Sequence, residues 1–124
     1  MESLIIEKTK TTPQINFNAN NGKLEISGES YPEDSLLTYR PIINWIEEFL
    51  NSSKKQLSFN FKLSYFNTSS SKCLLNILEM LDKASSNGWD IEINWYYQKD
   101  DEDMLETGEE FAEDISINFN FISI

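Results

Sequence analysis

Apolar and polar residues alternate in several short segments of the chain, which is the pattern of β-strands with one buried face. The alternation is most regular over residues 56–65. Similar patterns predict five further strands, at residues 4–6, 15–19, 24–28, 90–97 and 117–121. Between the second and third strands, Asn20, Asn21 and Gly22 supply the residue types of a tight hairpin turn. Gly28 is expected to end the third strand.

Three segments carry apolar residues at intervals of three or four, which is the spacing of one helix face. These helices are expected at about residues 36–52, 68–87 and 104–115. In the first, Pro41 suits a first helical turn, where the missing N–H has no helical partner. Asp34 or Ser35 would alternatively open an earlier turn.

The order of these elements predicts the fold. A strand, a helix and a second strand joined by short connections form a right-handed crossover with the two strands parallel. We therefore expect parallel strands at 56–65 and 90–97, and a mixed sheet because a hairpin precedes them. Alternating strands have one polar face, so the helices should cover mainly one side. The prediction is one α/β (α+β) domain over residues 1–124, with five to six strands in a mixed sheet.

Composition and charge narrow the function. The chain has 124 residues, of which 40% are hydrophobic, with 10 basic and 21 acidic residues and a net charge of −11. Nucleic acids and anionic membranes require clustered Lys and Arg, so neither is an expected partner. The first ten residues resemble neither a signal peptide nor a membrane span. We expect a cytoplasmic protein with no membrane insertion.

Few enzymatic motifs are available to this chain. It has no histidine, and its one cysteine, Cys73, falls on the apolar stripe of the second helix, where core packing is expected. No glycine-rich phosphate loop is present, so no cofactor is expected. The acidic residues 100–103 do not fit a calcium-loop spacing and suit a helix N-terminus better. We assign no metal ligand and no catalytic residue, although sequence alone leaves a carboxylate pair open.

A polar run precedes the second helix and is the most informative motif. Its members are Asn67, Thr68, Ser69, Ser70, Ser71 and Lys72. Asn67 or Thr68 is expected to cap the helix by accepting hydrogen bonds from its free N–H groups. One cap needs one side chain, and this run has four consecutive hydroxyls. A strand-to-helix turn also favours an anion, such as a phosphoryl group attached to a hydroxyl beside Lys72.

Several separate motifs now point to one family. They are YFNTSSSK (65–72), YPEDS (31–35), the spacing of Tyr39, Pro41 and Trp45, WYY (95–97), DDEDM (100–104) and GEEF (108–111). Together they resemble the bacterial SiaC family of regulatory phosphoproteins, from about Glu25 to Phe121. The first strands, Met1 to Ala19, carry no motif that matches.

The resemblance implies a STAS-like fold, the class that includes anti-sigma factor antagonists, and a non-catalytic role in partner-switching signalling. It implies that Thr68 is the phosphoacceptor. It also implies three protein partners: a dedicated kinase, a PP2C-like phosphatase, and a diguanylate cyclase that the unphosphorylated form binds and activates, in control of c-di-GMP and biofilm formation.

Other residues are candidates for the partner interface. They are Tyr31, Glu33, Asp34, Tyr65 and Tyr96, the last expected on the sheet face opposite Trp95. Lys72 would neutralise the phosphate or orient the donor nucleotide, or it is a solvated lysine on the helix surface. Two other functions stay open: a constitutive protein-binding adaptor, and a small enzyme that uses carboxylates and a divalent metal.

Overall fold

The computed structural model describes residues 1–124 and contains six strands and three helices. The strands are β1 (Leu4–Ile6), β2 (Gln14–Phe17), β3 (Lys23–Ser30), β4 (Gln56–Phe66), β5 (Asp90–Tyr97) and β6 (Phe119–Ser123). The helices are α1 (Ser35–Leu50), α2 (Thr68–Ser86) and α3 (Glu102–Glu113). All six strands form one sheet, in which spatial order follows chain order.

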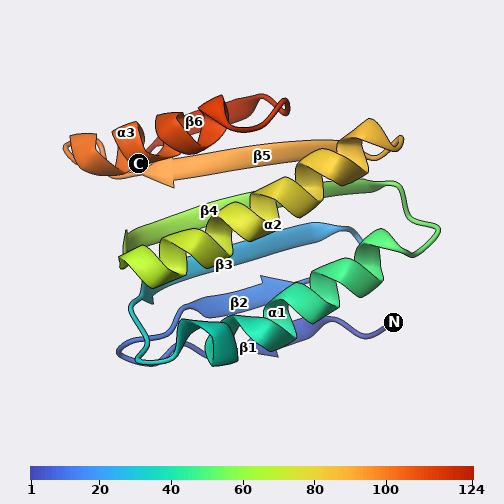
Figure 1. Ribbon diagram of the computed structural model, residues 1–124, viewed down its shortest axis with the longest axis horizontal. Helices are drawn as coiled ribbons and strands as arrows, with labels where there is room; N and C mark the ends of the chain where they lie inside the picture. Colours follow the sequence, from blue (N-terminus) through green and yellow to red (C-terminus); the bar gives the residue numbers. More distant parts are fainter.

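The sheet is mixed, as predicted. β1, β2 and β3 are antiparallel neighbours, whereas β3, β4, β5 and β6 are parallel. Each parallel pair is joined through a helix, because parallel strands need a long crossover connection. α1 and α2 lie across the same face of the sheet, and α3 lies beside β5 and β6 (Figure 1). The prediction of helices mainly on one face is confirmed.

The core fills the space between the sheet and its helices. It is a cluster of 25 buried residues with many aromatic contacts. Phe59 stacks on Phe61 with ring centroids 4.4 Å apart, and Phe17 contacts both Phe59 and Trp45. Cys73 is 4% exposed within this cluster, which confirms its predicted place in the core.

Pro41 does not lie in the first helical turn, so that prediction is wrong. α1 begins at Ser35, with Asp34 as its cap, and Pro41 lies in the second turn. The alternative, an earlier turn opened at Asp34 or Ser35, is correct. Pro41 has no N–H to donate to the carbonyl oxygen of Leu37, and it lies on the exposed side of α1, away from the buried Tyr39 and Ile42.

Gly28 does not end β3, which continues to Ser30. Instead, the register with β4 shifts between Gly28 and Glu29, so that Glu29 pairs with Tyr65. This irregularity reverses the alternation at the end of β4. Tyr65 is 51% exposed, and the next residue, Phe66, points into the core against Trp95 and Phe111.

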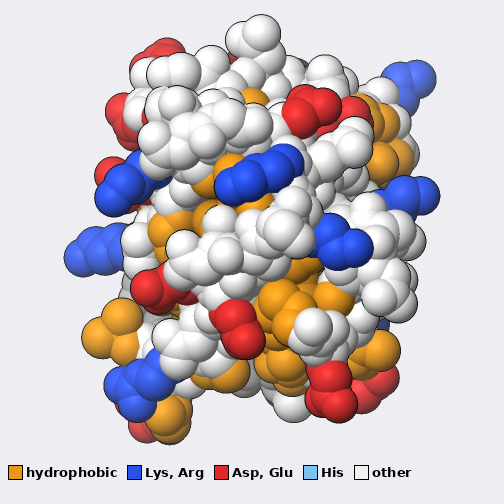
Figure 2. Space-filling model, turned by 90° about the vertical axis from the view of Figure 1, so that its right-hand side faces the viewer, with side chains coloured by type: hydrophobic (Ala, Val, Ile, Leu, Met, Phe, Trp, Pro, Cys, Tyr) orange, Lys and Arg blue, Asp and Glu red, His pale blue; other side chains and the backbone are white.

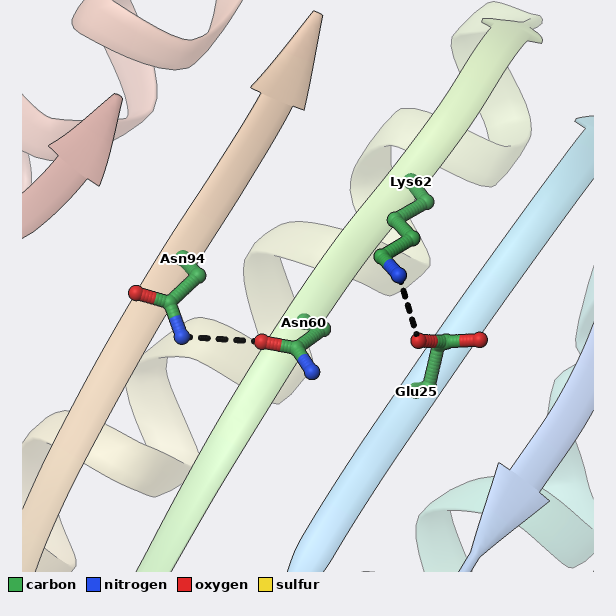
Figure 3. Close-up of polar contacts among 4 residues, drawn as sticks. All are labelled: Glu25, Asn60, Lys62 and Asn94. Carbon is green, nitrogen blue, oxygen red and sulfur yellow. Dashed lines mark hydrogen bonds and ion pairs between the residues drawn. The ribbon is translucent and has the colours of Figure 1, made fainter. Parts of the chain in front are cut away.

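The second face of the sheet carries polar side chains, four of which are drawn in Figure 3. Lys62 forms an ion pair with Glu25 at 3.0 Å. The Asn94 side-chain amide donates to the side-chain oxygen Oδ1 of Asn60 at 2.8 Å and accepts from the side-chain amide of Asn120 at 3.0 Å. These side chains connect neighbouring strands from β3 to β6 on this open face. They agree with the prediction that one face of the sheet is polar.

Candidate functional site

Two helix N-termini meet at one edge of the sheet. α1 follows β3 and α2 follows β4, and both begin at the carboxyl ends of these parallel strands, at the left of Figure 1. Asp34 caps α1 by accepting from the Leu37 N–H at 3.0 Å, and Asn67 caps α2 by accepting from the Ser70 N–H at 2.9 Å. The expected cap of the second helix is thus Asn67. The carboxyl edge of parallel strands is a common place for sites in α/β folds.

The four hydroxyls of the polar run have different environments. Thr68 is the first residue of α2, is exposed, and its hydroxyl makes no hydrogen bond. The Ser69 hydroxyl lies 2.6 Å from the Ser35 hydroxyl and donates to the side-chain oxygen Oδ1 of Asn67 at 3.2 Å. Ser70 is fully buried, and Ser71 is half-buried. Thr68 and Ser69 are both exposed, but only Thr68 combines exposure with a hydroxyl that makes no hydrogen bond.

Ser70 belongs to a buried chain of hydroxyls. The Ser30 hydroxyl donates to Ser70 Oγ at 2.8 Å and lies 2.7 Å from the Tyr39 phenol, which then donates to Ser30. Burial raises the pKa of Tyr39 to about 12, and the hydrogen bond with Ser30 acts in the opposite direction. This chain joins the end of β3 to both helices, so Ser70 has a structural role.

The first turn of α2 suits an added anion. It contains no acidic residue, in contrast to the first turn of α3, which contains Glu102 and Asp103. Free N–H groups and the helix dipole stabilise negative charge at this position. Lys72, one turn after Thr68, is exposed and forms no ion pair, since the one ion pair in the chain joins Lys62 to Glu25.

The structure places the predicted interface residues in two regions. Tyr31 and Tyr65 contact each other at the carboxyl edge, with ring centroids 5.8 Å apart, and Glu33 and Asp34 are exposed just before α1. Tyr96 instead lies on the open face, where the Lys62 ammonium is 4.7 Å from its ring centroid. The structure therefore brings the first four together but not Tyr96.

Two residues at this edge were not predicted as interface residues from the sequence. Leu36 and Leu37, in the first turn of α1, are 73% and 61% exposed. They lie outside the apolar stripe of α1 that faces the core. Their position outside the stripe was the signal available in the sequence. Two successive exposed apolar side chains are unusual on the outer side of a surface helix.

The acidic run after β5 has a structural explanation. Asp101 caps α3 by accepting from the Met104 N–H at 3.0 Å, which agrees with the predicted helix N-terminus. No three Asp, Glu or Cys side chains are grouped so as to hold a metal ion. None of the helices is long and apolar enough to cross a lipid bilayer.

A groove of about 600 Å³ lies at the opposite end of the molecule, between the C-terminal halves of α1 and α2. Its lining includes Leu50, Met80 and Trp89 together with Lys55 and Lys83. Figure 2 views this end and shows hydrophobic side chains between lysine or arginine side chains. The groove is separated from Thr68 by the length of α2.

Comparison with known proteins identifies the family. The model of the SiaC family of regulatory phosphoproteins matches residues 6–124. An uncharacterized protein of Pseudomonas aeruginosa (strain UCBPP-PA14) is 37% identical over 119 residues, which are 96% of this chain and 94% of that protein.

Solved structures agree with this match. SiaC of Pseudomonas aeruginosa superposes with a TM-score of 0.93 at 35% identity, over 100% of both chains. A chain in the crystal structure of the diguanylate cyclase SiaD in complex with its activator SiaC, also from Pseudomonas aeruginosa, gives 0.94 at 36% identity, over 98% of this chain and 99% of that one. The protein described here belongs to the SiaC family of regulatory phosphoproteins.

Proposed function

We propose that this protein is a non-catalytic switch in which phosphorylation of Thr68 controls binding to a diguanylate cyclase. The observation that carries the proposal is the environment of Thr68. This residue is exposed, its hydroxyl makes no hydrogen bond, and it begins a helix whose first turn contains no acidic residue. The crystal structure of the diguanylate cyclase SiaD in complex with its activator SiaC contains a chain that is 36% identical to this protein. In this proposal the unmodified protein binds and activates its cyclase.

The chemistry of the switch follows from the site. An unmodified Thr68 presents a small neutral hydroxyl at the exposed start of α2. Phosphorylation adds a charge of about −1.5 to −2 and three acceptor oxygens at that point. Burying such a group against an apolar or acidic partner costs desolvation and repulsion. A coupling of about 1–3 kcal/mol changes affinity about 5- to 150-fold, which is enough for regulation without refolding.

Two enzymes complete the cycle that we propose. A dedicated kinase transfers the phosphoryl group from ATP to the Thr68 oxygen, with loss of the hydroxyl proton, and a PP2C-like phosphatase hydrolyses the ester. Both reach Thr68 because it is exposed. Residues 1–124 act as one unit in this cycle, which the single sheet and continuous core support.

The first test is phosphorylation. The protein is incubated with the cognate kinase and ATP, and its mass is measured intact and after proteolysis. We expect a gain of one phosphoryl group on the peptide that contains Thr68, and no gain for Thr68→Ala. Ser71→Ala, which changes a hydroxyl in the same turn, is the control and should be modified normally. A phosphate that persists in Thr68→Ala would show that the assignment is wrong.

The second test separates the switch from a constitutive adaptor. Affinity for the cyclase is measured with the unmodified protein, the phosphorylated protein, Thr68→Asp and Thr68→Asn. Asp and Asn have similar shapes, so the difference between these two variants isolates the negative charge. A switch predicts weaker binding for the phosphorylated protein and Thr68→Asp, whereas an adaptor predicts equal binding by all four.

A further inference from the structure

The groove between the C-terminal halves of α1 and α2 has the size and lining of a small-molecule site. Its volume of about 600 Å³ lies within the roughly 300–1,000 Å³ that is typical of such sites. Leu50 from α1 and Met80 from α2 line it and are only partly buried, although both pack against the core. Figure 2 shows apolar surface exposed at this end of the molecule. The groove therefore offers apolar surface that a ligand would remove from water.

The charged part of the lining is mainly basic, although the chain as a whole has a net charge of −11. Lys55 and Lys83 line the groove, and Glu47 is the one acidic residue among the lining residues. Neither lysine forms an ion pair, since the one ion pair in the chain joins Lys62 to Glu25. Two lysines without a carboxylate partner favour an anionic group on the ligand.

The backbone holds Lys55 at the groove in an unusual conformation. Its φ is 140°, in the range that favours glycine, and another residue stays there only where its surroundings fix it. The Lys55 carbonyl oxygen accepts from the Asp90 N–H at 2.8 Å, which ties this residue to the start of β5. The Lys55 ammonium lies 5.6 Å from the ring centroid of Trp89, another lining residue. The cation is thereby positioned beside the apolar lining.

The C-terminal ends of α1 and α2 would oppose an anion if their carbonyl groups were free. Several of these carbonyl groups are occupied. The Phe49 carbonyl oxygen accepts from the N–H and the hydroxyl of Ser52, and the Ala84 carbonyl oxygen accepts from the Trp89 N–H at 3.1 Å. Lys83 also lies in the last turn of α2, where a cation offsets the remaining dipole. The helix ends therefore do not prevent binding of an anion between them.

We propose that this groove binds a small amphipathic anion. Its aliphatic body lies against Leu50 and Met80, and its carboxylate or phosphate group accepts hydrogen bonds from Lys55 and Lys83. The site goes beyond the proposed function, because no step of phosphorylation at Thr68 requires it. It would place a ligand on the same helix that begins at Thr68, but at the other end.

The test titrates the full chain with octanoate, octyl phosphate and octylammonium, each below its micelle-forming concentration. Backbone amide and tryptophan indole signals are followed by NMR. The three probes share one aliphatic chain and differ in head group, so their comparison isolates the charge. Saturable shifts at Leu50, Met80 and Trp89 are expected with octanoate or octyl phosphate, and the tighter of the two identifies the head group.

The cation octylammonium should bind at least about tenfold more weakly than the tighter anion. Shifts that do not saturate with either anion, or that lie on another surface, would overturn the proposal. Equal binding of the cation would overturn it as well, because the lysines would then play no part.

Substitutions test the two lysines directly. Lys55→Gln/Lys83→Gln should bind the anion at least about tenfold more weakly, because the head group loses both ammonium partners. Lys54→Gln is the matched control and should bind as the wild type does, since the Lys54 ammonium lies 3.5 Å from the Asn20 carbonyl oxygen and does not line the groove. Circular dichroism checks that the variants are folded, and the wild-type titration does not depend on them. Equal affinity of the folded double variant and the wild type would overturn the site.

Discussion

The hydroxyl oxygens of Ser35 and Ser69 lie 2.6 Å apart and join the first turns of α1 and α2. The contact holds the two helix starts together, although 34 positions separate the two serines in the sequence. Thr68, the proposed phosphoacceptor, directly precedes Ser69 in the chain. A phosphoryl group on Thr68 is therefore expected to act where the two helix starts meet, without a change of fold.

Removing the α2 cap should destabilise the protein at the candidate site. Asn67→Ala leaves the Ser70 N–H without its acceptor at 2.9 Å, and we expect a loss of about 1 kcal/mol in the free energy of unfolding. Asn67→Asp keeps the acceptor and should be close to wild type. Urea denaturation followed by circular dichroism measures both variants. Equal stability of the Ala and Asp variants would contradict this role.

The buried Ser30 should contribute more to the free energy of unfolding than the exposed Ser64. Ser30→Ala removes the hydroxyl that links Ser70 and Tyr39, and unpaired buried polar groups cost about 1–3 kcal/mol. Ser64→Ala, at an exposed serine, should change the free energy of unfolding by less than about 0.5 kcal/mol. Thermal and urea unfolding compare the two. A similarly small effect for Ser30→Ala would show that the chain of hydroxyls contributes little.

Tyr39 should give the stability a dependence on alkaline pH. Its folded pKa is about 12, above the usual value of 10, so folding favours the protonated phenol. The resulting stabilisation is complete below pH 10, is lost as the pH rises from 10 to 12, and amounts to about 2–3 kcal/mol. Tyr39→Phe should be less stable at pH 7 but should lose less stability between pH 9 and 11. Parallel curves for both proteins would contradict the assignment.

Gly108 should tolerate no larger side chain. A Cβ at this position would lie 2.5 Å from the Trp95 indole nitrogen, which donates to the Met104 carbonyl oxygen at 3.0 Å. Gly108→Ala must therefore displace Trp95 or α3, and overpacking of this kind costs about 1–3 kcal/mol. Glu109→Ala, at the next and exposed position, serves as the control. Unfolding followed by tryptophan fluorescence should report both the lost stability and the moved indole.

The open face offers a contrast between an exposed ion pair and a buried amide. Lys62 and Glu25 are 37% and 32% exposed, so Glu25→Gln should change the free energy of unfolding by less than about 1 kcal/mol. Asn94 is 8% exposed and bonds to amides on both neighbouring strands. Asn94→Ala should cost about 1–3 kcal/mol because both partners lose a hydrogen bond. Chemical denaturation measures the free energy of unfolding of both variants. A larger loss for Glu25→Gln than for Asn94→Ala would contradict this prediction.

The sequence by itself predicted the elements and the sheet. Side-chain alternation over residues 56–65 and helical spacing after Lys72 are local patterns, because a half-buried strand or helix must place apolar residues on one face. The cap within the polar run from Asn67 to Lys72 could also be predicted from local sequence, because a capping side chain bonds to an N–H within three positions of it. The family motifs agreed with the match found by comparison.

Only the tertiary structure distinguished among similar residues. Four consecutive hydroxyls look alike in sequence, but Ser70 is fully buried by partners on β3 and α1 while Thr68 is exposed. The register shift beside Gly28 turned Tyr65 outward, and the anchoring of Tyr39 in the core left Leu36 facing solvent. Exposure is decided by chain segments distant in sequence that pack at that point, and no local pattern contains that information.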